Sequence, residues 1–228
     1  RGKSIYRDEE VGEGGYVYAE PGIWHDIPVQ DVASMHPSSI EAEELFGPVY
    51  TKRFSELKAA RIAAKHFDRE ALKNLLGGEL LPYVTTEDDG KILAQALKIV
   101  INAIYGMTAA KFDNPFRDIR NKDNIVAKRG ALFMVNLKHE VQSRGFTVVH
   151  IKTDSIKVAN PTDELISFIR SYGKMYGYTF ETEHVYDRLC LVNDAVYIAK
   201  FKEPEVDKKT GKEIWWDATG AQFQQPYI

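Results

Sequence analysis

Short apolar runs that are broken by turn-forming residues alternate along the chain with longer stretches of helical periodicity. The short runs are rich in β-branched and aromatic side chains, which favours strands. The polar segment 207–211 has the composition of a hairpin tip. The strands expected from this pattern cover residues 29–33, 146–151, 156–159, 178–185 and 191–199.

The longer stretches predict helices, two of which lie close together in the sequence. Residues 54–76 are rich in Ala, Lys and Glu and contain no proline, so they predict one helix that ends at Gly77. Residues 91–105 predict another helix, with Gly106 as its C-terminal cap. A modest connector joins the two, which predicts an antiparallel helical hairpin.

This inventory predicts an α+β fold, in which helices back an antiparallel sheet. Further helices are expected from residue 37 to residue 46, over residues 126–144 and over residues 161–177. The helical hairpin falls between the first strand and the later strands, so it is expected as an insertion. A chain of 228 residues can bury a core of its own and should form one domain with this excursion, or two subdomains.

Composition indicates the cellular compartment but not the reaction. Cys190 is the only cysteine, which excludes an internal disulfide and favours the reducing cytoplasm. No apolar run approaches the ~20 residues of a membrane span, and no signal peptide opens the chain, so no membrane partner is expected. The net charge of −3 argues only mildly against nucleic acid, because it does not report on local patches.

Two aspartates far apart in the sequence stand on predicted strands or turns. Asp31 lies in the strand at 29–33, and Asp154 lies in the turn after the strand at 146–151. Two carboxylates that a sheet brings together can hold the pair of Mg²⁺ ions used for nucleotidyl transfer, with Mn²⁺ as a substitute. The alternative is that each aspartate only caps a helix or a turn.

The predicted helix at 91–105 carries polar side chains on one face. Lys98, Asn102 and Tyr105 are spaced at i, i+4 and i+7, beside a separate apolar stripe. These groups suit a triphosphate, a base edge and a sugar, although a plain amphipathic surface helix explains Lys98 equally well.

The preceding helix carries a basic stripe. Lys58, Arg61 and Lys65 follow one another at i, i+3 and i+7, a spacing that suits phosphate binding. A solvated charged face remains the alternative, because acidic residues are nearby.

Three segments resemble the motifs of family B DNA polymerases. Asp31 to Ser38 resembles D-x-x-S-L-Y-P-S, Lys98 to Gly106 resembles K-x-x-x-N-S-x-Y-G, and His150 to Ser155 resembles Y-G-D-T-D-S. Residues 13–16 resemble the glycine-rich motif of that family, which contacts the template. The segments occur in the family's order and span nearly the whole chain.

The resemblance implies template-directed DNA synthesis, with primer-template DNA and a dNTP as partners. By this likeness, Asp31 and Asp154 are the catalytic metal ligands, helped by the backbone carbonyl of Val32. The other implied contacts are phosphate binding by Lys98, Arg61 and Lys65, a base-pair pocket at Asn102 and Tyr105, and template contacts at Gly14 and Gly15.

The resemblance also implies a division into subdomains. A palm would cover residues 1–49 and 107–228, and fingers would cover residues 50–106. The exonuclease and thumb of the family are expected outside this chain. A phage or other mobile element is the expected source, which would place the protein in a bacterial cytoplasm.

Lys152 is the first of three departures from the family motifs, because it stands where the first acid of D-T-D is usual. Its ammonium would either pair with the carboxylates and weaken Mg²⁺ binding or point outward to a primer phosphate. A polymerase-like module that binds nucleic acid without turnover is therefore a second hypothesis. A nucleotidyl cyclase is a third, although a cyclase does not need the helical hairpin.

The other departures concern the sugar and the primer. His36 replaces the tyrosine that excludes a 2′-hydroxyl, so it is expected to act as the sugar gate, with a structural histidine as the alternative. Residues 194–197 match K-K-x-Y only at Tyr197, without the lysines. Glu183 matches a palm glutamate that lies near the metals in the family.

Overall fold

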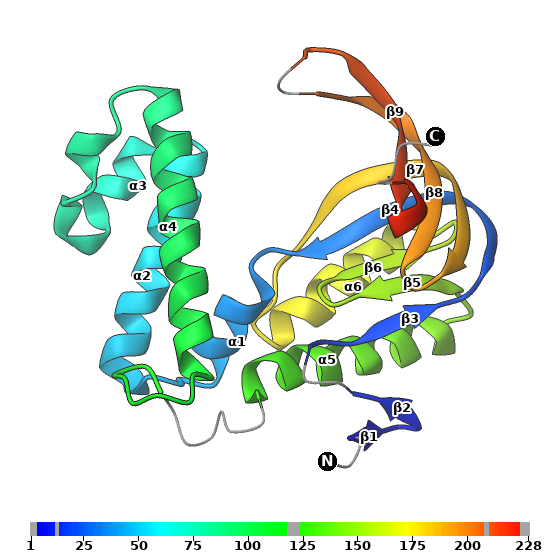
Figure 1. Cartoon of the computed structure of the whole chain (residues 1–228), viewed down its shortest axis with the longest axis horizontal. Helices are drawn as coiled ribbons and strands as arrows, with labels where there is room; N and C mark the ends of the chain where they lie inside the picture. Colours follow the sequence, from blue (N-terminus) through cyan, green and yellow to red (C-terminus); the bar gives the residue numbers. More distant parts are fainter. Residues whose placement is uncertain (1–3, 12–13, 118–123, 208–209, 224–228) are drawn as a thin grey trace. The chain divides into compact units, whose positions relative to one another are not determined.

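The computed structural model describes the chain except for residues 1–3, 12–13, 118–123, 208–209 and 224–228. It divides into two compact units (Figure 1). The sheet unit comprises residues 1–35 and 127–228, and the helical unit comprises residues 36–126. The names palm and fingers stay predictions for the ranges given above. Among the described residues, no helix is both long and apolar enough to span a membrane.

A seven-stranded sheet forms the sheet unit, and every pairing in it is antiparallel. The order across it is β3-β5-β6-β4-β7-β8-β9, so the first long strand, β4, lies between two later ones. A separate pair, β1 (Ile5–Tyr6) and β2 (Glu9–Glu10), precedes it. The strands of the large sheet are β3 (Val17–Ala19), β4 (Gly22–Val32), β5 (Val148–Lys152), β6 (Ser155–Val158), β7 (Phe180–Asn193), β8 (Val196–Val206) and β9 (Glu213–Thr219).

Two helices cover one face of this sheet. Both α5 (Ile125–Ser143) and α6 (Asp163–Met175) lie along it in Figure 1. Met134 and Leu137 of α5 and Ile169 of α6 are fully buried in one cluster with residues of β5, β6 and β4. Side chains alternate along a strand, so Val29 and Tyr186 belong to a second cluster on the opposite face. That opposite face carries the candidate site.

The helical unit is built around two long antiparallel helices. Its elements are α1 (Met35–Ala42), α2 (Gly47–Lys65), α3 (Arg69–Asn74), the short 3₁₀ turns η1 (Leu76–Gly78) and η2 (Leu81–Tyr83), and α4 (Glu87–Thr108). Gly90 of α4 allows the two helices to pack closely, because a Cβ at this position would collide with the backbone carbonyl of Ala64 on α2. Small side chains of α2 line the same contact. The capping box of Thr86 and Asp89 begins α4. The predicted helical hairpin is therefore confirmed, as is the α+β fold.

Several predicted boundaries were wrong. The helix expected at 54–76 is two helices, because Phe67 has φ of 55° and Asp68 caps a new helix. Gly106 lies inside α4 rather than after it, because the helix continues to Thr108. The strand expected at 191–199 is interrupted, since β7 ends at Asn193 and β8 begins at Val196.

Candidate active site

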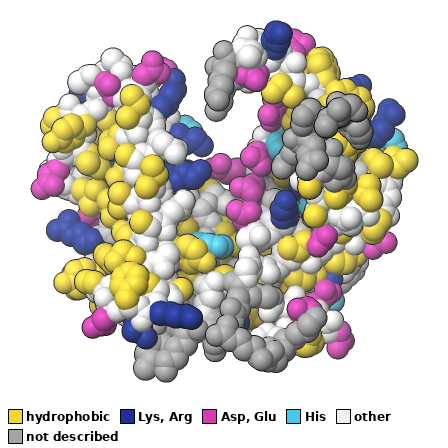
Figure 2. Space-filling view, viewed as in Figure 1, with side chains coloured by type: hydrophobic (Ala, Val, Ile, Leu, Met, Phe, Trp, Pro, Cys, Tyr) yellow, Lys and Arg dark blue, Asp and Glu magenta, His cyan; other side chains and the backbone are white. Residues whose placement is uncertain are grey.

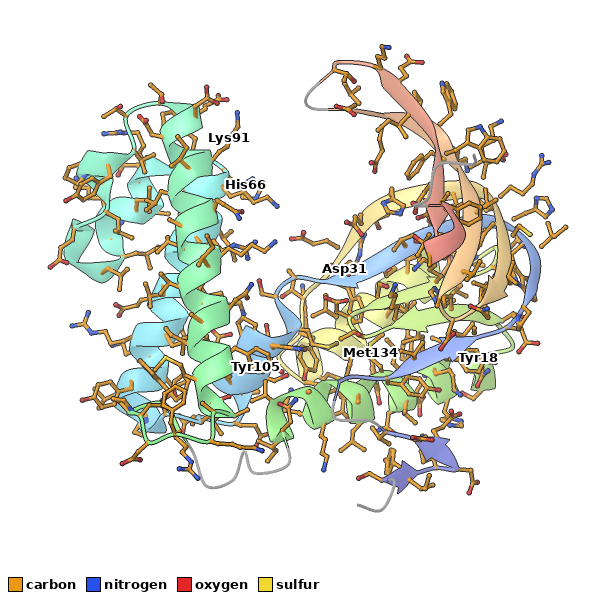
Figure 3. All side chains as sticks on the ribbon, viewed as in Figure 1. Tyr18, Asp31, His66, Lys91, Tyr105 and Met134 are labelled. Carbon is orange, nitrogen blue, oxygen red and sulfur yellow. The ribbon has the colours of Figure 1, made fainter. Side chains whose placement is uncertain are left out.

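The two aspartates that the sequence singles out lie side by side at one end of the sheet. Asp31 pairs with Ser155 of β6, and the Val32 amide donates a hydrogen bond to the Asp154 carbonyl oxygen at 2.9 Å. Asp154 is in the turn between β5 and β6, and Asp31 is near the end of β4, where Figure 3 labels it. Strand pairing therefore brings together two residues that are distant in the sequence.

The turn that carries Asp154 is held by the glycine-rich segment. Thr153 has φ of 55°, an unfavourable value for a β-branched residue. Its amide donates to the Tyr16 carbonyl oxygen at 2.9 Å. A Cβ on Gly15 would lie 2.9 Å from the Thr153 side chain, and Gly15 has φ of 115°, so only glycine fits there. Gly14 has open space beside it.

A cavity of about 330 Å³ lies beside the carboxylates on the face of the sheet away from α5 and α6. Burial raises the pKa of Asp31 to about 7, and the negative charges of Asp154 and Glu183 add to this shift. Figure 2 shows acidic side chains gathered at this part of the sheet unit. These carboxylates repel one another when they are ionised, so a bound cation that neutralises them is favoured.

The donors at this place fit a hard divalent cation. Mg²⁺ binds carboxylate and carbonyl oxygens and keeps several waters, so it requires few protein ligands. Asp31 and Asp154 supply two carboxylates, and Glu183 lines the same cavity. Within the described part of the chain, no group of three or more His, Cys, Asp or Glu side chains is arranged to hold a metal.

Lys152 lines the same cavity from its rim. The side chain is exposed, and its ammonium makes no ion pair with a carboxylate of the described residues. Of the two placements expected for this lysine, the paired one is absent from the structure.

The cavity contains a buried polar group that the motifs did not indicate. Lys157 of β6 is 4% exposed, and burial lowers its pKa to about 8. The negative charge of Asp217 on β9 is the largest influence that opposes this lowering of the Lys157 pKa. The Asp217 carboxylate accepts hydrogen bonds from the hydroxyls of Tyr186 at 2.5 Å and Tyr197 at 3.1 Å. The available signal was a lysine within an otherwise apolar strand, Ile156 to Ala159.

The predicted nucleotide-binding residues lie on the helical unit. Lys98 and Asn102 are exposed on α4, and Arg61 and Lys65 are on α2. Figure 2 shows Lys and Arg side chains on the surface of this unit.

Lys58, the first residue of the predicted basic stripe on α2, is engaged within the helical unit. Its ammonium pairs with Glu41 at 2.6 Å and donates to the Ser38 hydroxyl at 2.8 Å.

His36 and Tyr105 are brought together within the helical unit. Their ring centroids are 4.5 Å apart, with the planes inclined by 59°. Tyr105 is on α4 and is labelled in Figure 3, and its hydroxyl donates to the Asn124 side chain at 3.4 Å. The expected sugar gate and a residue of the expected base-pair pocket are therefore neighbours, a contact that sequence separation alone did not show.

Comparison with known proteins yields one curated relative and one solved structure of interest. The chain is 30% identical over 159 residues to DNA polymerase II of Escherichia coli (strain K12), an alignment that covers 62% of this chain. Its fold matches the family B DNA polymerase of the hyperthermophilic archaeon Pyrobaculum calidifontis with a TM-score of 0.59, at 17% identity over 96% of this chain. The sequence likeness supports a fragment of a family B DNA polymerase, and the structural likeness shows the fold.

No protein-family model matches the chain. The chain spans 19% of the length of the E. coli relative and 30% of the archaeal chain. This likeness agrees with the resemblance found in the sequence motifs. It does not by itself assign the roles of individual residues.

Proposed function

We propose that this chain carries the catalytic centre for template-directed DNA synthesis, in which a dNTP is joined to the 3′-hydroxyl of a primer. The observation that carries this proposal is the pairing of Asp31 with the turn of Asp154 beside a cavity that favours a cation. When bound, two Mg²⁺ ions would lower the pKa of the primer hydroxyl and neutralise the leaving pyrophosphate. Asp31, Asp154 and the Val32 carbonyl would hold them, with Glu183 nearby.

The proposal gives each of the protein residues a role. The carboxylates orient the reacting groups, and the turn of Thr153 fixes one of them. We assign Lys98, Arg61 and Lys65 to the phosphates of the dNTP, because ammonium and guanidinium groups bind phosphate oxygens and the side chains of Lys98 and Lys65 are exposed. We assign Asn102, Tyr105 and His36 to the base and sugar of the incoming nucleotide. In this proposal the sheet unit is the palm and α2 and α4 form the fingers.

Gly14 and Gly15 are assigned to the template. Gly14 has no neighbouring atom in the space that a side chain would fill, so a nucleic-acid backbone can approach there.

Lys152 favours a second function, a polymerase-like module that binds DNA without turnover. Its positive charge replaces an acid at the rim of the cavity, which reduces the attraction for Mg²⁺. The exposed position of its ammonium makes this reduction small, because water screens it.

The decisive experiment is template-directed dNTP incorporation by the 228-residue chain with Mg²⁺ or Mn²⁺. We expect weak incorporation by this chain alone, because much of the affinity for duplex DNA should come from phosphate contacts that it lacks. Asp154→Ala should lower this incorporation about a thousandfold, because electrostatic stabilisation of the reacting groups is lost. Glu164→Gln removes a carboxylate from the first turn of α6 and serves as the control. Cation-dependent DNA binding without incorporation by the folded wild type would favour the second function.

A further inference from the structure

The side chain of Lys157 is enclosed by protein and yet borders the cavity. It is 4% exposed, and its neighbours across the ladder are Val29 on β4 and His150 on β5. Among the described residues, none forms a hydrogen bond or an ion pair with its ammonium. The ammonium makes a cation–π contact with the ring of Tyr197, whose centroid lies 5.8 Å away.

An ammonium in this state needs an acceptor. It has three N–H donors, and burying them without hydrogen-bond acceptors is unfavourable. The Tyr197 ring compensates only part of this cost at such a distance. The hydroxyl of Tyr197 donates to Asp217, and no hydrogen bond joins it to the Lys157 ammonium. The donors of Lys157 are therefore available to whatever occupies the cavity.

The occupant must satisfy both halves of the cavity. The carboxylates of Asp31 and Asp154 repel an anion unless cations are bound with it, whereas Lys157 attracts one. The 3′ end of a DNA strand has a neutral hydroxyl and, one sugar away, an anionic phosphodiester. A hydroxyl near the carboxylates and a phosphate near the ammonium would match this arrangement.

We propose that Lys157 binds the phosphate of the terminal internucleotide linkage of a primer strand. The inference rests on the proposed function, and it adds a primer-binding residue on β6. The segment 194–197, which lacks the lysines of K-K-x-Y, keeps only Tyr197, and that tyrosine is the residue beside the Lys157 ammonium.

The test measures binding of a primer-template to the 228-residue chain by fluorescence anisotropy, with Ca²⁺ present and dNTP absent. One primer has a charged terminal linkage, and the other has a neutral methylphosphonate there. Wild type should bind the neutral primer about tenfold more weakly, as expected for a lost charge-assisted hydrogen bond. Lys157→Met should bind the charged primer about tenfold more weakly and show no further loss with the neutral one.

Two further variants separate this role from others. Lys157→Arg should keep the preference for the charged linkage. Lys152→Met removes the same charge from the exposed rim of the cavity and should also keep it. Thermal unfolding of Lys157→Met checks its folding, and no loss of stability is expected because the removed charge is buried and unpaired.

Equal discrimination between the two primers by wild type and Lys157→Met would overturn the inference. So would tighter Ca²⁺ binding in that variant with unchanged DNA binding, because Lys157 would then only offset the carboxylates. If the variant weakens competition by dNTP or pyrophosphate and not the response to the terminal linkage, the phosphate belongs to the nucleotide instead. Wild type that discriminates between the primers without incorporating dNTP would contradict the proposed function and leave this inference standing.

Discussion

The carboxylate cavity of the sheet unit and the long helices of the helical unit are built in opposite ways. The cavity combines residues from β4, β5, β6, β7, β8 and β9 and from the turn after β5, so its composition depends on strand order. The exposed groups of α4 follow from one helix, since Lys98 and Asn102 are one turn apart. Charge in the cavity is partly buried and perturbed, whereas Lys65 on α2 and Lys98 on α4 are exposed.

This difference shows two ways in which a fold can position functional side chains. A helix arranges its residues by local periodicity, so a substitution on its exposed face changes one contact. A site assembled across strands shares its electrostatics, so a change in one carboxylate alters the ionisation of its neighbours. Mutations that act on packing, on shared charge and on a single contact should therefore have effects of different size.

Gly90→Ala tests the close packing of the helical unit and should have the largest effect. The added Cβ would collide with the Ala64 carbonyl, a backbone atom that cannot turn away. We expect the free energy of unfolding to fall by about 2–3 kcal/mol, measured by urea denaturation.

The matched control for this change is Gly106→Ala, also within α4 but with no atom within 4 Å of the new Cβ. It should raise the free energy of unfolding by about 0.5–1 kcal/mol. A rise of the same size for Gly90→Ala would show that α2 and α4 are not in such close contact.

Asp31→Asn tests the shared charge of the sheet unit. The pKa of Asp31 is raised to about 7 in the folded chain, so folding binds a proton that the unfolded chain releases at lower pH. Wild-type stability is therefore expected to fall as pH rises from about 4 to about 7. The variant should be about 2 kcal/mol more stable at pH 8 without divalent cations, after allowance for partial exposure, and no more stable at pH 4.

Cation addition provides the control for this prediction. Mg²⁺ or Mn²⁺ should raise the melting temperature of wild type at pH 8 and have little effect on Asp31→Asn. Equal stabilisation of both proteins would place the cation elsewhere.

His36→Ala tests a single contact of the helical unit and should have the smallest effect. Loss of the imidazole removes a ring that lies against Tyr105. In the role proposed for His36, this loss opens space for a 2′-hydroxyl. The preference for dNTP over rNTP should fall about tenfold, or about 1.4 kcal/mol, in single-nucleotide incorporation. An unchanged preference, with retained folding, would leave His36 a structural residue.

The sequence predicted the fold class and the helical hairpin because both depend on periodicity and composition, which are local. It identified Asp31 and Asp154 through motifs, and the structure brings them together. Lys157 and Asp217 were missed because strand register, not spacing, places them in the cavity. The break after α2 was missed because it depends on the positive φ of Phe67, a residue type that gives no turn signal.

The hydrogen bond from the Thr153 amide to the Tyr16 carbonyl oxygen has a kinetic consequence. That amide can exchange with solvent only while the segment before β3 has detached from the turn of Asp154. The strand β3 is at the edge of the sheet and pairs with β5 through only three residue pairs, so it is expected to detach more readily than the central strands. The lifetime of the closed turn is thus limited by the opening of an edge strand. The rate of deuterium uptake at the Thr153 amide would report on this opening.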